Sequence, residues 1–286
     1  MPKNPDRINE VSKAFGETLN AHGYGFQHTI VVKANELALA LKSPWIKPVL
    51  EFPAEVQGYG TRIDFILQHK DKPIFLLAEC KRVNPALSDW CFGKAGYIPQ
   101  DSLIAESYFF ETLQRKEGSY SFLSGVQMLQ RFDDIYHIAL EVRSGNKGEA
   151  SGQGRGAIEE AATQLCRGMN GLISYFEHHQ KIFAKYKYLA GFVPVIFTTA
   201  QLWSSDVNLG SADTENGTIK LSEMQVKPKN WLLYNYNQSP GLKHSIPFNR
   251  PSDELQQALY DEYVRPIFIV NSLGIEDFLC SPIWKK

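Results

Sequence analysis

Three charged residues interrupt apolar segments of the chain at Asp64, Glu79 and Lys81. Residues 74–78, which precede Glu79, are continuously apolar, as in a strand buried on both faces. Because residues two apart on a strand share a face, Glu79 and Lys81 should point the same way, with Cys80 on the other side. Neighbouring strands lie about 4.8 Å apart, so a hairpin joining the two segments brings Asp64 within reach of Glu79. The sequence therefore predicts two carboxylates and an ammonium at the end of a hairpin.

Two carboxylates held close together are unfavourable unless a positive charge lies between them. Oxygen ligands of this kind suit Mg²⁺ or Mn²⁺, which keep several waters that a substrate phosphate can displace. A metal at this place would polarise the phosphate and lower the pKa of a bound water. Lys81 would orient that water or neutralise charge that develops on the phosphate. These residue types at this spacing predict metal-dependent hydrolysis of a phosphodiester bond.

The elements that must position these residues follow from apolar periodicity and turn signals. Helices are expected at residues 6–20 and 30–41, followed by a meander of three strands at residues 49–56, 62–68 and 74–83. Residues 85–130 have a mixed, aromatic-rich pattern that predicts two or three helices, the clearest of them at residues 102–115. The rest of the chain predicts a strand at 136–142, a glycine-rich loop at 144–156, a long helix at 157–176, a strand at 193–199, short strands at 219–221, 231–236 and 266–270, and a last helix at 276–279. A helix followed by a strand indicates a crossover connection.

The two segments that carry the charged residues resemble the motif of the PD-(D/E)XK, or restriction-endonuclease-like, nuclease superfamily. They read Gly60-Thr-Arg-Ile-Asp-Phe-Ile-Leu67 and Leu76-Leu-Ala-Glu-Cys-Lys-Arg82. The resemblance implies that Asp64 and Glu79 are metal ligands, that the backbone carbonyl of Cys80 is a further ligand, and that Lys81 is the catalytic lysine. It covers roughly residues 36–82 and also implies an α/β fold with a mixed central sheet flanked by helices.

The resemblance also suggests residues beyond the motif itself. Members of the superfamily often add a glutamate from the helix before the meander, and Glu36 is the matching candidate, with Glu51 and Glu55 as rivals on the first strand. Some members place a glutamine on the helix after the meander, which suggests Gln164, but the accompanying tyrosine is absent because position 168 is glycine. By the same resemblance we expect Mg²⁺ or Mn²⁺ as cofactor, DNA rather than RNA as substrate, endonuclease rather than exonuclease action, and a homodimer. Restriction, phage defence and repair are the settings that such an activity suggests.

A single nuclease-like domain over residues 1–286 is the expected organisation. It consists of core motifs at 30–83, a helical insertion at about 85–156, and a helix–strand unit with extra C-terminal strands at 157–286. The 286 residues are 43% hydrophobic, enough for one large core. Lysine and arginine (30) nearly balance aspartate and glutamate (31), so bulk charge neither supports nor excludes a DNA substrate. No apolar run is long enough to span a bilayer, and the four dispersed cysteines fit a reducing, cytoplasmic setting.

Other interpretations of the same residues stay open. The hairpin could be a surface hairpin with an ordinary Glu–Lys pair, or the fold could serve a non-catalytic nucleic-acid-binding or interaction protein. The glycine-rich stretch is read as a solvated linker, as a phosphate-contacting loop at a helix N-terminus, or as the turn of a nucleotide-binding regulatory protein. The residues that we expect to contact a nucleic acid are Arg82, Lys147, Arg155 and Gln164.

Overall fold

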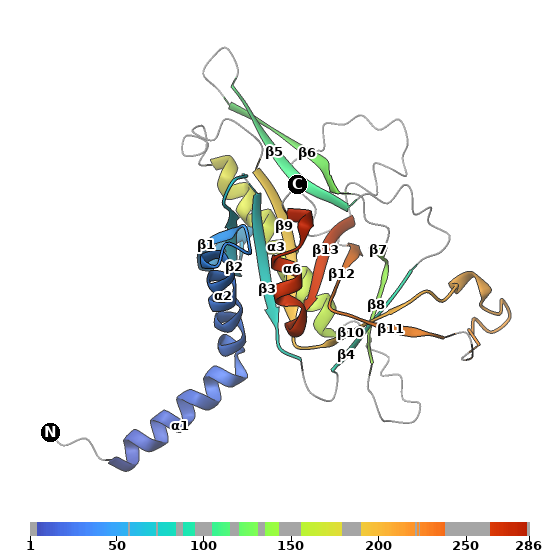
Figure 1. The fold of residues 1–286 in the computed structure, drawn as a ribbon, viewed down its shortest axis with the longest axis horizontal. Coiled ribbons are helices and arrows are strands. Elements are labelled where there is room, and N and C mark those ends of the chain that lie inside the picture. Colours follow the sequence, from blue (N-terminus) through green and yellow to red (C-terminus); the bar gives the residue numbers. More distant parts are fainter. Residues whose placement is uncertain are drawn as a thin grey trace.

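A large mixed sheet with helices on both faces forms the body of the protein, as the computed structural model shows (Figure 1). The structure describes residues 5–56, 58–72, 74–83, 88–94, 105–114, 120–130, 135–142, 156–178, 190–220, 222, 224–237 and 264–284. The expected α/β class, with a mixed sheet flanked by helices, is confirmed.

The predicted meander is present at the start of the large sheet. Strands β1 (Trp45–Val56), β2 (Tyr59–His69) and β3 (Ile74–Lys81) pair antiparallel in sequence order. Gly58, with φ of 82°, allows the tight turn between β1 and β2. The meander thus places the segments of Asp64 and Glu79 on adjacent strands.

Beyond β3 the sheet continues with strands from distant parts of the chain. Its order is β1-β2-β3-β9-β13-β12-β7, in which the added strands are β9 (Ala190–Thr198), β13 (Val264–Asn271), β12 (Trp231–Asn237) and β7 (Ile135–Tyr136). Strand β9 runs parallel to both β3 and β13, whereas β12 is antiparallel to β13. The strands predicted at 193–199, 231–236 and 266–270 are therefore confirmed.

Helix α3 (Gly156–His178) packs on one face of this sheet, and α2 (Tyr24–Leu39) with α6 (Ile275–Leu279) packs on the other. Successive side chains of β3 point to opposite faces of the sheet and so join two different hydrophobic cores. Leu77 packs in the core on the α3 side, and Leu76 packs in the core on the α2 side. The chain from β3 through α3 to the parallel strand β9 is the crossover that the sequence indicated.

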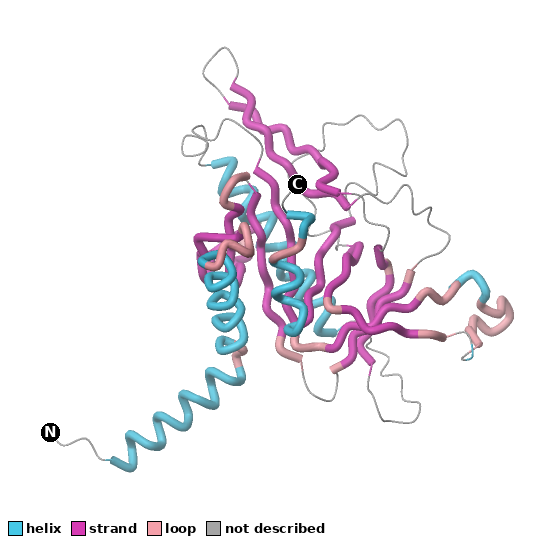
Figure 2. Tube along the Cα trace, in the orientation of Figure 1, coloured by secondary structure: helices cyan, strands magenta, loops and turns pink. Residues whose placement is uncertain are grey.

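Helix α1 (Pro5–Ala21) extends away from the body (Figures 1 and 2). The sequence correctly predicts an amphipathic helix here, but its apolar residues do not join the described core. Ile8, Val11 and Phe15 are all about half exposed or more. Short 3₁₀ turns lie at Leu209–Ser211, Ser272–Gly274 and Pro282–Trp284.

The expectation of a helical insertion is wrong for the residues that the structure describes. They form strands β4 (Asp89–Gly93), β5 (Ala105–Gln114), β6 (Tyr120–Gln130) and β8 (Ile138–Val142). Residues 102–115 contain good helix formers, but β5 pairs with β6 and with β9, and its aromatic residues suit a strand. Pairing between distant segments therefore overrides local helix propensity.

A second, four-stranded sheet also has no counterpart in the sequence prediction. It has the order β11-β10-β4-β8, where β10 is Gln201–Ser205 and β11 is Val226–Lys229. The single strand expected at 136–142 is split, since β7 joins the large sheet and β8 the small one. Residues 219 and 220 are irregular rather than the start of a strand. Among the helices in the described ranges, none combines the length and apolar character needed to cross a membrane.

Candidate functional site

Asp64 and Glu79 face each other where strands β2 and β3 stop pairing. The last registered pair is Phe65 with Ala78, so the next position outward places Asp64 opposite Glu79. The Oδ2 atom of Asp64 accepts the backbone N–H of Cys80 at 2.7 Å. This bond fixes the aspartate carboxyl between the two strands, beside the backbone that follows Glu79.

Burial dominates the electrostatics of this pair. Only 4% of Glu79 is exposed, and burial raises the pKa of its carboxyl from 4.5 to about 9, with the nearby charge of Asp64 adding to the rise. Burial likewise raises the pKa of Asp64 from 3.8 to about 6, although the Cys80 N–H opposes this. At neutral pH the Glu79 carboxyl therefore holds a proton unless another positive charge enters the pair.

Lys81 lies on the same side of β3 as Glu79, two residues further along. Its Nζ atom is 2.6 Å from Oε2 of Glu160 on helix α3. The lysine side chain is 22% exposed and that of Glu160 is 64% exposed, so the ion pair is more accessible to solvent than Glu79. The positive charge of Lys81 also lowers the pKa of Glu79, against the effect of burial.

Gln27 connects a third carboxylate to the pair. Its side-chain amide donates to Oε1 of Glu51 at 2.8 Å and to the backbone carbonyl of Asp64 at 2.7 Å. The charge of Glu51 raises the pKa values of both Asp64 and Glu79. Among the three glutamates that the sequence suggested, Glu51 is thus the one beside the site. Glu36 is exposed on α2, where its charge acts on Lys33, and Glu55 is exposed on β1.

Helix α3 approaches the meander closely because two of its residues are glycines. A Cβ atom at Gly168 would lie 2.7 Å from Cγ1 of Ile63, and one at Gly171 would lie 2.9 Å from the backbone nitrogen of Glu55. A tyrosine at position 168 would not fit this packing. Gln164 is half-buried and lies one helical turn from both Glu160 and Gly168, on the same stripe of α3.

Of the three basic residues expected to contact a nucleic acid, the structure describes Arg82. Arg82 is exposed, and its Nη1 atom donates to the carbonyl of Asn20 at the end of α1, at 2.5 Å. Lys147 and Arg155, with residues 144–155 of the glycine-rich stretch, lie outside the described residues.

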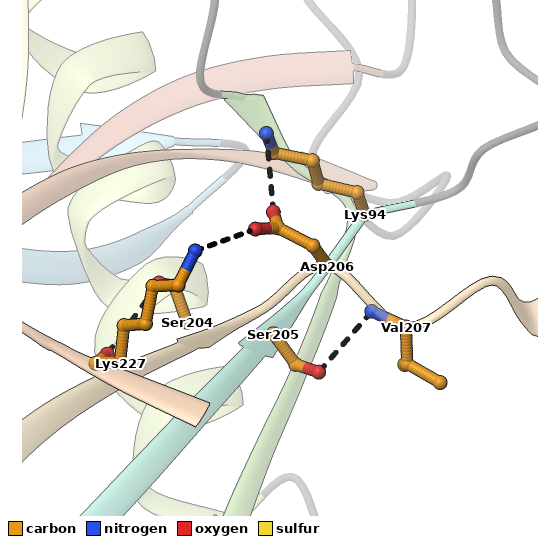
Figure 3. A network of polar contacts seen from close by, with 6 residues as sticks. All are labelled: Lys94, Ser204, Ser205, Asp206, Val207 and Lys227. Atoms are coloured by element: carbon orange, nitrogen blue, oxygen red, sulfur yellow. Dashed lines mark hydrogen bonds and ion pairs between the residues drawn. The ribbon is translucent and has the colours of Figure 1, made fainter. Parts of the chain in front are cut away.

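Lys94, which directly follows strand β4, forms an ion pair beside the four-stranded sheet. Its Nζ atom lies 3.4 Å from Oδ1 of Asp206, and Nζ of Lys227 lies 3.4 Å from Oδ2 of the same carboxylate (Figure 3). The Lys94 ammonium is also 5.7 Å from the centroid of the Tyr136 ring. These contacts tie the end of β4 and strand β11 to Asp206, which directly follows β10.

The oxygen atoms around Asp64 and Glu79 suit a hard divalent cation that takes only a few of its ligands from the protein. In the part of the chain that the structure describes, no group of three or more His, Cys, Asp or Glu side chains is arranged to hold a metal ion. Mg²⁺, however, usually binds through one or two carboxylates and completes its shell with water and substrate phosphate. Two carboxylates with the Cys80 carbonyl fit that pattern, and a cation would offset the cost of burying both charges.

Sequence reasoning missed Gln27 and Glu160. Gln27 precedes the buried residues Ile30, Val31 and Ala34 by three, four and seven positions, so it lies on their helical face. A polar residue on the buried face of a helix could have indicated a functional role. It was not recognised because the helix was expected to begin at residue 30, whereas it begins at Tyr24. Nothing in the local sequence indicates that Glu160 meets Lys81, since that contact depends on where α3 crosses the sheet.

Comparisons of the chain with protein-family models, with curated proteins and with solved structures find no match.

Proposed function

We propose that this protein is a metal-dependent nuclease of the PD-(D/E)XK kind, which hydrolyses phosphodiester bonds in DNA. The observation that carries the proposal is the pair Asp64 and Glu79 at the open end of the β2–β3 hairpin, with Lys81 on the same side of β3 as Glu79. The succession of α2, β1, β2 and β3, followed after strands β4 to β8 by α3 and β9, supports the proposal. With β9 parallel to β3, these elements form a mixed sheet between helices, which the sequence resemblance implies.

The residues of the site have separate tasks under this proposal. The carboxylates of Asp64 and Glu79 and the carbonyl of Cys80 would hold Mg²⁺ or Mn²⁺. When bound, the ion supplies a Lewis acid and a water of lowered pKa. Lys81 orients the attacking water or neutralises charge on the phosphate. The Cys80 N–H and the Gln27 amide keep Asp64 in place through its carboxyl and its carbonyl, respectively.

Several narrower proposals rest on the sequence resemblance. They are preference for DNA over RNA, endonuclease action, a homodimer that cuts both strands, and a role in restriction, phage defence or repair. Gln164 is the α3 residue that we propose to contact the nucleic acid. It is half-buried and lies one helical turn from Glu160, which meets Lys81.

The test is cleavage of plasmid DNA, linear duplex DNA, single-stranded DNA and RNA in Mg²⁺, Mn²⁺ or EDTA. We expect DNA cleavage that EDTA abolishes and that falls at least about 100-fold in both Glu79→Gln and Lys81→Met. Glu36→Gln serves as the matched control, because it neutralises an exposed carboxylate away from the pair. Circular dichroism of each variant establishes that it is folded.

Two outcomes would overturn the proposal. One is a wild-type protein that cleaves none of these substrates at any metal concentration. The other is cleavage that survives in the folded Glu79→Gln variant, because the buried pair would then have no part in the reaction. DNA binding without cleavage would instead favour the non-catalytic binding protein.

A further inference from the structure

The ion pair between Lys81 and Glu160 joins two elements that are far apart in the sequence. The two charged atoms are 2.6 Å apart, which is short for a charge-assisted contact, and the residues are 79 positions apart. Glu160 belongs to α3, which Gly168 and Gly171 hold tightly against β2 and β1. The glutamate therefore extends from a rigid element.

Two further carboxyl groups, those of Glu79 and Asp64, lie close enough to Lys81 for its charge to act on them. Glu79 shares its face of β3, and Asp64 stands opposite Glu79 on β2. Glu79 is almost completely buried, so no solvent screens it, whereas Glu160 is largely exposed. An ammonium close to Glu79 favours the ionised carboxylate, and the attraction between the two charges is stronger in the buried, less polar surroundings of the pair than at the exposed Glu160. If Glu160 were neutral, the flexible lysine stem would let the ammonium move toward the buried pair.

An ammonium drawn into the pair would compete for the position that a divalent cation needs. We propose that Glu160 is a positioning residue that holds the Lys81 ammonium outside the Asp64–Glu79 pair and so keeps the pair open to a divalent cation. This inference rests on the proposed function and extends it to a residue on a different element.

The test measures Mn²⁺ binding to the full chain by isothermal titration calorimetry. We expect Glu160→Gln to bind Mn²⁺ about 10-fold to 100-fold more weakly than wild type, the range seen when an outer contact of a metal site is lost. The double variant Glu160→Gln with Lys81→Met should recover wild-type affinity or better, because the competing ammonium is gone. Glu160→Asp, which keeps the charge, should lie between Glu160→Gln and wild type.

Glu159→Gln is the matched control. It removes the neighbouring carboxylate in the same helical turn, but Glu159 accepts a hydrogen bond from the Tyr236 hydroxyl, at 2.7 Å, rather than meeting Lys81. Both changes remove one negative charge near the N-terminus of α3, so a general effect of helix charge would appear in both. We expect unchanged Mn²⁺ affinity in Glu159→Gln.

Cleavage kinetics give a second readout. In Glu160→Gln, kcat at limiting Mn²⁺ should fall with the loss of affinity and should recover substantially at saturating Mn²⁺, while KM for DNA changes little.

The outcomes separate this inference from the proposed function. Equal Mn²⁺ affinity in wild type and Glu160→Gln, or no recovery in the double variant, overturns the positioning role and leaves the nuclease proposal intact. The expected binding pattern without cleavage of any nucleic acid supports the positioning role and overturns the nuclease proposal. A wild-type protein that binds no Mn²⁺ overturns both.

Discussion

Replacement of Glu79 by glutamine should stabilise the metal-free protein at neutral pH. The raised pKa means that the folded state binds more protons than the unfolded chain between pH 4.5 and about 9. The unfolding free energy therefore decreases as pH rises through this window, by at most about 1.4 kcal/mol per pH unit. Between pH 4.5 and pH 7 the buried Glu79 carboxyl lowers the unfolding free energy by about 3 kcal/mol. A neutral glutamine of similar shape avoids this loss.

Urea unfolding in EDTA, followed by circular dichroism, measures this effect. We expect Glu79→Gln to be about 3 kcal/mol more stable than wild type at pH 7 and nearly equal to it at pH 4.5. Glu36→Gln, which neutralises an exposed carboxyl on α2, should leave the unfolding free energy within about 0.5 kcal/mol at both pH values. Mg²⁺ should stabilise wild type at pH 7 and should stabilise Glu79→Gln much less.

A glutamine variant that is no more stable than wild type at pH 7 would refute the reasoning, because burial would then impose no cost on the Glu79 charge. A gain of the same size at pH 4.5 would also refute it, since a packing effect would not depend on protonation.

Two further predictions concern the framework around the site. Gly171→Ala should destabilise the fold by about 2 kcal/mol in urea, because its Cβ would lie 2.9 Å from the backbone nitrogen of Glu55. Gly16→Ala, with open space around it in α1, is the control and should not destabilise. His69, whose Nε2 meets the Trp284 carbonyl at 2.9 Å, has a pKa lowered by burial, so its contribution to stability is complete above pH 6.5 and decreases as pH falls below that value. His69→Gln should therefore reduce the loss of unfolding free energy between pH 7 and pH 5.

Each of these has a clear contrary result. Equal urea midpoints for Gly171→Ala and wild type would mean that α3 can move away from β1 without cost. An unchanged pH dependence in His69→Gln, measured by tryptophan fluorescence, would mean that the histidine is protonated as readily in the folded protein as in the unfolded chain.

The meander and its charged residues were predictable because they depend on local patterns. Alternation fixes which side of β3 Glu79 and Lys81 share, and a short polar turn determines that β2 and β3 pair. The opposition of Asp64 and Glu79 follows from these two facts. The helix before the meander and the helix before β9 were also recognisable from their periodicity.

The remaining parts depend on contacts between distant segments. Residues 105–114 could be read as a helix until β6 and β9 provide strand partners. The sequence shows only that position 168 is glycine, and the reason lies in the packing, since a Cβ atom there would lie 2.7 Å from Cγ1 of Ile63. The partner of Lys81 could not be read from the sequence, because the contact with Glu160 spans 79 residues of chain.

The pairing of β3 also determines the order in which the protein can fold. On one side β3 pairs with β2, which is connected to it by a short turn. On the other side it pairs with β9, where the partner of Ile74 is Gly191, 117 residues later in the chain (191 − 74). Local hairpins close quickly, and contacts between such distant segments form late. We therefore expect a nascent chain to assemble its carboxylate pair early and to expose the apolar edge of residues 74–78 until β9 is synthesised. During that interval the edge can pair with a strand of another chain, so aggregation during synthesis competes with completion of the sheet.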